Sequence, residues 1–269
     1  MSTAAESLPL PTSTLRMRRL RTHLVEIKYE LLKLMRLPGY VIPTLTFPLI
    51  FYIFFGIAFG QGKVTGSTKM AAYLIATYGT FGVMGASMLG IGINLAIERG
   101  QGWLQVKRAT PMPMSAFLMA KIAVAVSFGS VIVLGLFILG ASFGGVRFAP
   151  AVWAQLFATL VAGTLPFCAL GLTLGYWAGP NSAPAIANLI YLPLSFASGL
   201  WIPIDFLPKF VQKLALFLPP YHLSQLTLRV IGAGKGPAWA HVLALASYSV
   251  LFLLLASAGY AKDEGKTYG

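Results

Sequence analysis

The sequence predicts an all-α membrane protein with six transmembrane helices. Of its 269 residues, 57% are hydrophobic and 10% are charged, whereas soluble domains average about 45–50% apolar and about 25% charged residues. Charged residues are also kept out of long apolar stretches, and about 20 apolar residues are enough for a helix to cross a bilayer. The predicted spans are 41–59, 71–97, 117–143, 152–178, 183–200 and 238–260.

The placement of basic residues supports the same class. The chain has a formal net charge of +13, and its lysines and arginines flank the apolar stretches. This arrangement is typical of membrane orientation and does not favour a nucleic-acid partner. Because they are more frequent on the side that holds both termini, we expect the termini in the cytoplasm.

The first 36 residues predict two different segments. Residues 1–14 are rich in Ser, Thr, Ala and Pro without periodicity, so we expect a disordered tail that lacks the layout of a cleavable signal. Residues 15–36 predict a basic amphipathic helix that lies in the membrane interface; the alternative is a soluble helix packed on a partner. Residues 37–262 form the predicted transmembrane domain, and 263–269 a cytoplasmic tail. The apolar face of the helix consists of Leu20, Leu24, Ile27, Leu31 and Leu34.

Small residues recur at four-residue steps in two of the spans. Gly82, Ala86 and Gly90 share one face of span two, and Gly171 and Gly175 share one face of span four. Such stripes allow another helix to approach closely. The alternative is that they are scattered small residues of ordinary spans.

A polar interruption, Glu98 to Ser115, separates spans two and three. Its charged residues Glu98, Arg99, Lys107 and Arg108 must leave the hydrocarbon. Residues 101–108 are long enough for about two turns of amphipathic helix. Two prolines follow, and Ser115 is a plausible N-cap for span three. A short amphipathic helix between two spans can be bound by a cytoplasmic partner.

The connection between spans five and six, residues 201–237, is apolar but divided by prolines. Its pieces are too short to span, so they predict short re-entrant or interfacial outer helices. Asp205 is expected as the N-cap of a helix that begins near Phe206; the alternative is a contact with substrate. The expected outer residues are Ser198, Gly199, Pro203, Asp205, Pro208, Pro219 and Tyr221.

The sequence lacks several kinds of chemistry. No acidic residue lies in the middle of a predicted span, and Lys121 lies near a span end, from which it can reach the interface. This argues against a proton- or sodium-coupled carrier and against a channel with a ring of charges. The single cysteine and three scattered histidines predict no metal site, and neither hydrolase motifs nor a P-loop occurs. We therefore expect no catalytic residue, metal or cofactor in this chain.

Three motifs in this order resemble the permease subunit of type-2 ABC exporters. The first is the amphipathic helix at 15–36. The second is E-R-G-Q-G-W-L at 98–104, followed by A-T-P-M-P-M-S-A-F-L-M-A-K at 109–121. The third is S-G-L-W-I-P-I-D-F-L-P at 198–208, with L-P-P-Y-H at 218–222.

The resemblance implies a complex in the bacterial cytoplasmic membrane. Two permeases, identical or different, would pair with two ABC ATPase subunits that bind ATP and Mg. The chain would be no enzyme by itself, and would receive the ATPase movement through a coupling segment. That segment consists of Glu98, Arg99, Gly100, Gln101, Gly102, Trp103, Leu104, Lys107 and Arg108.

The expected cargo is hydrophobic or amphipathic, such as a drug-like compound or a lipid, because the predicted pathway contains no buried charge. Export of a polysaccharide or other polymer is the next choice, and a non-transporting scaffold or sensor is the rival from another class. A membrane enzyme is disfavoured by the missing motifs. Aromatic residues that could line the pathway, or else face lipid or core, are Phe51, Phe55, Tyr78, Phe81, Tyr191 and Phe196.

Overall fold

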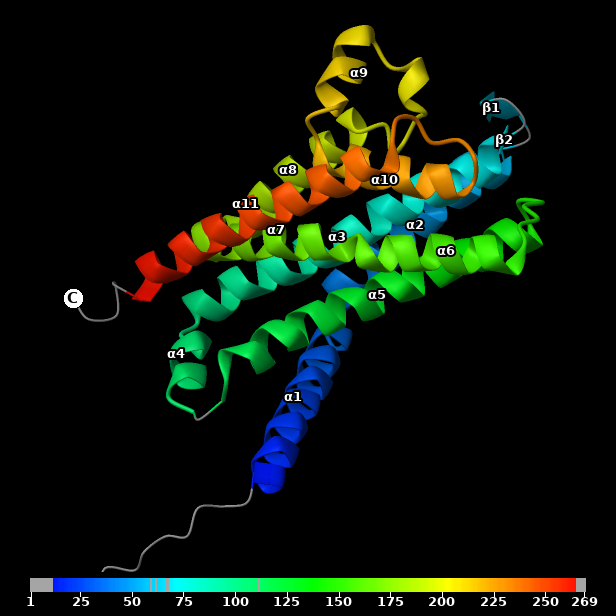
Figure 1. Ribbon diagram of the computed structural model, residues 1–269. Helices are drawn as coiled ribbons and strands as arrows, with labels where there is room; N and C mark the ends of the chain where they lie inside the picture. The colour runs from blue at the N-terminus through cyan, green and yellow to red at the C-terminus, as the bar shows by residue number, and fades with distance from the viewer. Residues whose placement is uncertain (1–11, 59, 61, 66–67, 111, 265–269) are drawn as a thin grey trace, which may run out of the picture.

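The protein is an elongated bundle of helices with one small hairpin (Figure 1). The computed structural model describes residues 12–58, 60, 62–65, 68–110 and 112–264. Its elements are α1 (Thr12–Met35), α2 (Pro38–Phe51), the π-helix η1 (Tyr52–Ala58), β1 (Lys63–Thr65), β2 (Thr68–Lys69), α3 (Met70–Gly100), α4 (Trp103–Arg108), α5 (Met114–Ser142), α6 (Pro150–Ala162), α7 (Thr164–Trp177), α8 (Ala183–Ala197), the 3₁₀ turn η2 (Ile204–Phe206), α9 (Lys209–Ala215), α10 (Pro219–Val230) and α11 (Ala238–Glu264).

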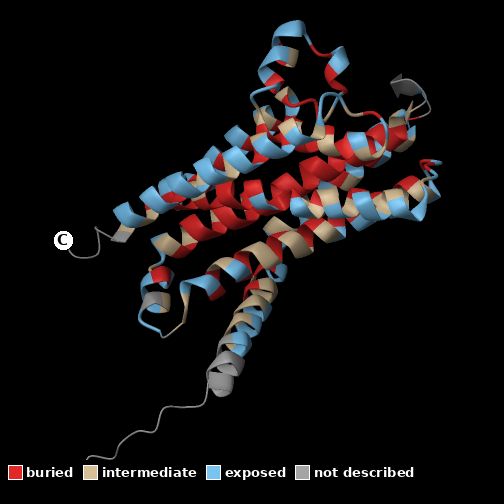
Figure 2. Ribbon diagram, in the orientation of Figure 1, coloured by how far each residue is buried: buried red, intermediate tan, exposed pale blue. Residues whose placement is uncertain are grey.

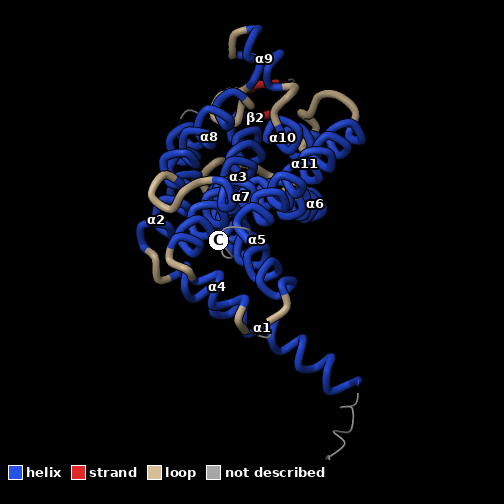
Figure 3. Tube along the Cα trace, turned by 90° about the vertical axis from the view of Figure 1, so that its left-hand side faces the viewer, coloured by secondary structure: helices blue, strands red, loops and turns tan. Residues whose placement is uncertain are grey.

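Helix α3 is the centre of the bundle. It is buried along most of its length (Figure 2), and the view along the bundle in Figure 3 places α2, α5, α7 and α8 around it. Glycines allow this close packing, because a Cβ added at Gly82 would lie 2.5 Å from the Cγ2 atom of Ile132 in α5.

Among the residues that the structure describes, five helical stretches are long and apolar enough to cross a membrane. They are Pro38–Ala58, Met70–Gly100, Met114–Ser142, Pro150–Trp177 and Ala238–Asp263. The predicted fifth span is shorter than expected: α8 has 15 residues, which at about 1.5 Å per residue rise less than the hydrocarbon thickness of about 30 Å. It ends early because Gly199 adopts a φ of +73°, in the left-handed region that favours glycine.

Several predicted boundaries are corrected. Predicted span four consists of two helices, α6 and α7, which meet at Gly163. The loop expected at 60–69 contains the antiparallel pair β1–β2. Helix α1 begins at Thr12, and α11 continues to Glu264, past the expected start of the tail. The remainder of both predicted tails, 1–11 and 265–269, lies outside the described residues.

The helix predicted at the interface leaves the bundle at a steep angle (Figures 1 and 3). Leu34 is buried, Ile27 and Leu31 are half-buried, and Leu20 and Leu24 are exposed. The bundle therefore covers the apolar face of α1 only toward its C-terminal end, and the rest is free to meet a lipid surface.

Figure 1 distinguishes two ends of the bundle. We call the end that carries α4 and the last turns of α11 the α4 end. The opposite end carries η2, α9 and the β1–β2 hairpin, and we call it the α9 end.

Candidate functional site

The polar interruption forms a short helix at the α4 end. Helix α3 runs through Glu98 and Arg99 to Gly100 before it stops. Gly102 follows with a φ of +76°, which favours glycine, and α4 covers Trp103–Arg108. The structure thus has a helix over the last six of the eight residues predicted to form one.

The apolar side chains of α4 point in two directions. Leu104 is buried and packs in an apolar cluster that includes Leu95 of α3 and Phe117 of α5. Trp103 and Val106 are 55% and 57% exposed. Leu104 therefore packs α4 against the bundle, while the large apolar side chains of Trp103 and Val106 face outward.

A lysine ties α4 to α1. The Nζ atom of Lys107 lies 2.5 Å from Oε1 of Glu26, and 4.8 Å from the centroid of the Phe117 ring. Because Glu26 belongs to α1, any displacement of α4 acts directly on that helix.

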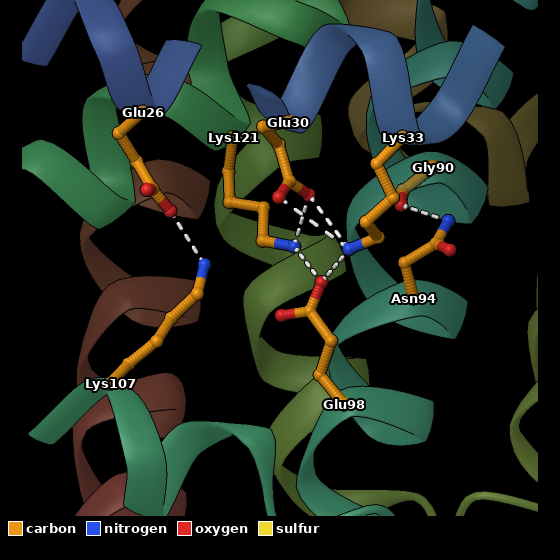
Figure 4. A network of polar contacts seen from close by, with 8 residues as sticks. All are labelled: Glu26, Glu30, Lys33, Gly90, Asn94, Glu98, Lys107 and Lys121. Atoms are coloured by element: carbon orange, nitrogen blue, oxygen red, sulfur yellow. Dashed lines mark hydrogen bonds and ion pairs between the residues drawn. The ribbon is translucent and has the colours of Figure 1, made fainter. Parts of the chain in front are cut away.

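A buried cluster of ions lies one step further inside (Figure 4). The ammonium of Lys121 in α5 lies 2.6 Å from Oε1 of Glu30 in α1 and 2.7 Å from Oε1 of Glu98 in α3. All three side chains are at most 8% exposed. Lys33 of α1 completes the cluster through ion pairs with Glu98 and Glu30. Two carboxylates and two ammonium groups compensate each other, as buried charges require.

The cluster shifts the titration of its members on α1. Burial raises the pKa of the Glu30 carboxyl, but the positive charges of Lys121 and Lys33 outweigh burial and hold this pKa below its ordinary value of 4.5. Burial lowers the pKa of Lys33, but Glu98 and Glu30 outweigh it and raise this pKa above 10.5. The charged forms are therefore the stable ones at neutral pH.

The expectation for Lys121 is wrong. The side chain is 3% exposed and does not extend to the surface of the bundle, because acids from α1 and α3 meet it inside. The expectation that the spans contain no buried charge fails with it. Absence of buried charge therefore no longer speaks against an ion-coupled carrier.

Ser115 does not cap α5. The helix begins at Met114, and Pro113 occupies the N-cap position without a side-chain hydrogen bond. The Ser115 hydroxyl lies 3.2 Å from Nε2 of His23 in α1 instead. It adds a third contact between α1 and the segment around α4.

Arg99 fastens the end of α3 to two other helices. Its Nη1 atom donates to the backbone oxygen of Gly175 in α7 at 2.6 Å, and its Nη2 atom donates to Oδ1 of Asp263 in α11 at 2.8 Å. Gly100 is pressed against the turn after α7, where an added Cβ would lie 2.6 Å from Cγ of Pro180.

The predicted coupling residues thus divide into an inner and an outer set. Glu98, Arg99 and Leu104 make contacts inside the chain. Gln101 and Trp103 are exposed, and Lys107 is half-buried. The side chain of Arg108 lies outside the described part of the chain. A partner at this end would meet Gln101, Trp103, Gln105 and Val106.

The sequence reasoning missed the members of the site on α1. Glu26, Glu30 and Lys33 are four and three residues apart, a spacing that places them on one face of a helix. Two acids in an otherwise basic helix were the signal available, since acids are scarce in this chain.

The six aromatic residues predicted to line a pathway gather in one group. Phe51 stacks with Phe55 and contacts Tyr78 and Phe81; Phe81 stacks on Tyr191 with centroids 4.8 Å apart. Trp201, which the prediction omitted, lies 5.1 Å from Phe51 and 6.4 Å from Phe196. Tyr78, Phe81 and Tyr191 are buried, so the centre of the group is filled within one chain.

The predicted small-residue stripes contact helices of the same chain. The Tyr40 hydroxyl in α2 donates to the backbone oxygen of Ala86, and a Cβ at Gly90 would meet that hydroxyl at 2.3 Å. A Cβ at Gly171 would lie 2.9 Å from the backbone oxygen of Ser87, and one at Gly175 would lie 2.7 Å from Leu95. The stripes therefore bring α2 and α7 against α3.

The expected outer residues lie at the α9 end, where Ser198, Pro203, Pro219 and Tyr221 are buried and Pro208 is exposed. The expectation for Asp205 is wrong. It lies inside the turn η2, while α9 begins at Lys209 after an N-cap Pro208, and Asp205 pairs with Lys235 instead.

A second polar contact at this end joins α10 to α11. The Nδ1 atoms of His222 and His241 lie 2.9 Å apart. No group of three His, Cys, Asp or Glu side chains that could hold a metal occurs among the residues that the structure describes.

The fold and this site define a multi-pass helical membrane protein. A short helix at one end packs on the bundle and pairs with α1, and buried ions join α1 to α3 and α5. The chain belongs to the ABC-2 type transporter family, whose profile matches residues 24–231. It is 29% identical over 235 residues to the protein named "Putative transport permease YvfS" of Bacillus subtilis (strain 168), covering 87% of this chain and 95% of that relative. The predicted family is confirmed, and the chain is a membrane permease.

Proposed function

We propose that this chain is the membrane-spanning subunit of an ATP-driven exporter, and that a separate ABC ATPase moves it through α4. The observation that carries the proposal is the double role of α4: Leu104 seats it on the bundle, while Trp103 and Val106 stand more than half exposed. Exposed large apolar side chains at the rim of a polar segment suit a protein partner, and Trp is common among the residues that dominate interfaces.

The contacts around α4 suggest how a movement would spread. A push on α4 acts on α1 through the Lys107–Glu26 pair, and on α3 and α5 because α4 is joined to both through short turns. The cluster of Glu30, Glu98 and Lys121 links the same three helices. The helices would therefore move as a unit rather than one at a time.

The remaining parts of the proposed complex follow the family. Two ATPase subunits would serve two permeases, and ATP and Mg would bind to the ATPase, since the sequence contains no P-loop. The complex would lie in the bacterial cytoplasmic membrane with the α4 end and both termini in the cytoplasm.

A hydrophobic or amphipathic cargo fits a groove on this chain. A groove of about 610 Å³ lies between α2, α3 and α8, with walls that include Phe47, Leu89, Ile93 and Leu192. Export of a polymer by the same architecture and recruitment of a partner without transport are the alternatives.

Reconstitution tests the proposal. The chain is placed in liposomes with the ATPase that co-purifies with it, and ATP hydrolysis and uptake of an amphipathic dye are measured. Trp103→Ala and Val106→Ser should lower both rates while leaving the amount of folded chain unchanged. Phe217→Ser, at an even more exposed position in the turn after α9, serves as the matched control.

Three outcomes would contradict parts of the proposal. Uphill transport without any ATPase would refute the proposal that a separate ATPase supplies the energy. Full activity of both α4 variants would refute the role of α4. Binding of an ATPase without movement of any cargo would favour the scaffold.

A further inference from the structure

We propose that a groove between α1, α3 and α4 binds the primary ammonium head of an amphipathic molecule, and that Glu98 receives this head. The inference rests on the proposed export function, because it names the class of molecule that the site would take. The groove has a volume of about 520 Å³. Its apolar walls are Tyr29, Leu37, Ile97 and Trp103.

One oxygen of the Glu98 carboxylate is available to accept a hydrogen bond. Its Oε1 atom accepts from both Lys33 and Lys121, whereas Oε2 is buried without a hydrogen-bond partner among the described residues. In Figure 4 this second oxygen points away from both ammonium groups. An ionised carboxylate accepts up to about four hydrogen bonds, and leaving a buried acceptor unpaired is costly.

The hydrogen-bonding capacity of the groove, and not its net charge, selects the head. Glu26, Glu30 and Glu98 line it with Lys33 and Lys107, and Lys121 balances the third carboxylate from within the bundle. A head with N–H donors gains a charge-assisted hydrogen bond from Oε2, and an anionic head would meet the carboxylates.

The groove also provides for an apolar tail. It shares Leu37, Asn94 and Ile97 with the larger groove between α2, α3 and α8. A molecule whose head lies at Glu98 can therefore extend its chain along apolar walls away from the α4 end. Rotation of the carboxylate about its last bond, a soft torsion, would turn Oε2 to the head.

Photo-crosslinking tests the site on the full chain. The chain is purified in phosphatidylcholine nanodiscs and exposed to dodecylamine that carries a diazirine in its tail, and labelled peptides are mapped by mass spectrometry. We expect labelling of α1 and α3 around Tyr29, Leu37 and Ile97. Unlabelled dodecylamine should compete, whereas dodecyltrimethylammonium, which has no N–H donor, and dodecanoate should not.

Two variants and a control sharpen the test. Ile97→Trp narrows the groove by bulk, and Glu98→Gln keeps the shape but removes the charge. Glu98→Gln should reduce labelling by about tenfold, the effect of losing one hydrogen bond to a charged group. Ile97→Trp should reduce labelling at least as much, because its ring occupies the place of the ligand. Met119→Trp, at an exposed position on α5, should change nothing. If Glu98→Gln does not fold, Ile97→Trp still decides. Undiminished labelling of Ile97→Trp, or equal competition by the quaternary amine, overturns the proposal.

A further pair of conditions identifies the natural source of the head. If phosphatidylethanolamine in the nanodisc suppresses labelling, the site takes a lipid headgroup; if it does not, the site takes a foreign amphiphilic amine. Both results support the site. The experiment needs no ATPase, so absent labelling with intact ATP-driven transport refutes the site alone, and labelling without any transport refutes the export function alone.

Discussion

Glu30 of α1 and Lys121 of α5 stand 91 positions apart in the chain, yet their Oε1 and Nζ atoms lie 2.6 Å from each other in the interior. Both side chains are at most 4% exposed. Separation of α1 from α5 would leave a charge on each helix without its partner. The buried pair thus holds α1 to the bundle even though much of its apolar face is exposed.

Replacing Lys121 tests how much this cluster stabilises the fold. Lys121→Met leaves Glu30 and Glu98 to share Lys33, and should destabilise the fold by about 3–5 kcal/mol, the usual cost of removing one partner from a buried ion pair. Thermal unfolding of the purified chain in detergent measures it. Lys209→Met, an exposed lysine at the α9 end, should be neutral. Equal melting temperatures for the two variants would show that the pair carries no stability.

The same cluster predicts a pH window for stability. A carboxyl whose pKa is lowered in the folded state stabilises it above the unfolded value, and this stability is lost as pH falls through the folded pKa. The stabilising contribution of Glu30 is therefore present above its ordinary pKa of 4.5 and is lost as pH falls below it. Lys33, whose pKa is raised, acts in the opposite sense: its contribution is lost as pH rises above 10.5. The difference in unfolding free energy between the chain and Glu30→Gln, measured at fixed pH values, cancels the titration of His222. It should stay constant between these limits, and a slope in that difference would contradict the assignment.

Close packing of α3 and α7 predicts the effect of one methyl group. Gly171→Ala places a Cβ 2.9 Å from the Ser87 backbone oxygen and 3.1 Å from Cβ of Ile91, and overpacking of this kind costs about 1–3 kcal/mol. Gly39→Ala is the matched control because nothing lies within 4 Å of its Cβ. It should be neutral or slightly stabilising, since Ala favours a helix by up to about 1 kcal/mol over Gly. Denaturant titration compares them; an unchanged midpoint for Gly171→Ala would argue against tight packing.

The histidine pair predicts a response to acid at the α9 end. The Nε2 atoms of His222 and His241 face the backbone oxygens of Leu216 and Lys235, which only accept, so both Nε2 atoms carry hydrogen. The Nδ1 atoms of the two rings lie 2.9 Å apart, so protonation of both rings would set two N–H donors against each other. The Tyr221 and Tyr248 rings flank the pair, and Asp205 is taken by Lys235.

Protons on both rings should break this contact. Burial and the neighbouring His241 lower the pKa of His222 below 6.5, so its contribution to stability is lost as pH falls through that lowered value. Histidine ¹⁵N spectra across pH 4–8 should show His222 titrating below 6.5, with loosening between α10 and α11 as it does. His222→Gln should abolish the loosening. A His222 that titrates at or above 6.5 would contradict this account of the pair.

The sequence could predict what depends on local pattern. Apolar runs and turn residues located five helical stretches that are long and apolar enough to cross a membrane, a helix within residues 15–36 and the short helix after Gly102. The aromatic residues were found as a set because Phe51, Tyr78 and Tyr191 stand in apolar runs, although Trp201, which connects them, lies in a loop.

Contacts between distant elements could not be predicted in the same way. Lys121 read as a residue near a span end because nothing local shows that Glu30 of α1 will face it. His222 and His241 are 19 residues apart with α11 beginning between them, so their pairing depends on how α10 turns back. Ser115 and Asp205 had the right residue type for caps, but neighbouring prolines took those positions.

The central claim is that an ATPase acts on the α4 end, and site-directed cross-linking tests it most directly. The only cysteine, Cys168, is buried, so Cys168→Ser gives a background in which single cysteines can be placed at Val106 on α4 and at Phe217 after α9. We predict that a bifunctional reagent joins the co-purified ATPase to Val106→Cys and not to Phe217→Cys. Cross-links at Phe217→Cys with none at Val106→Cys would contradict it.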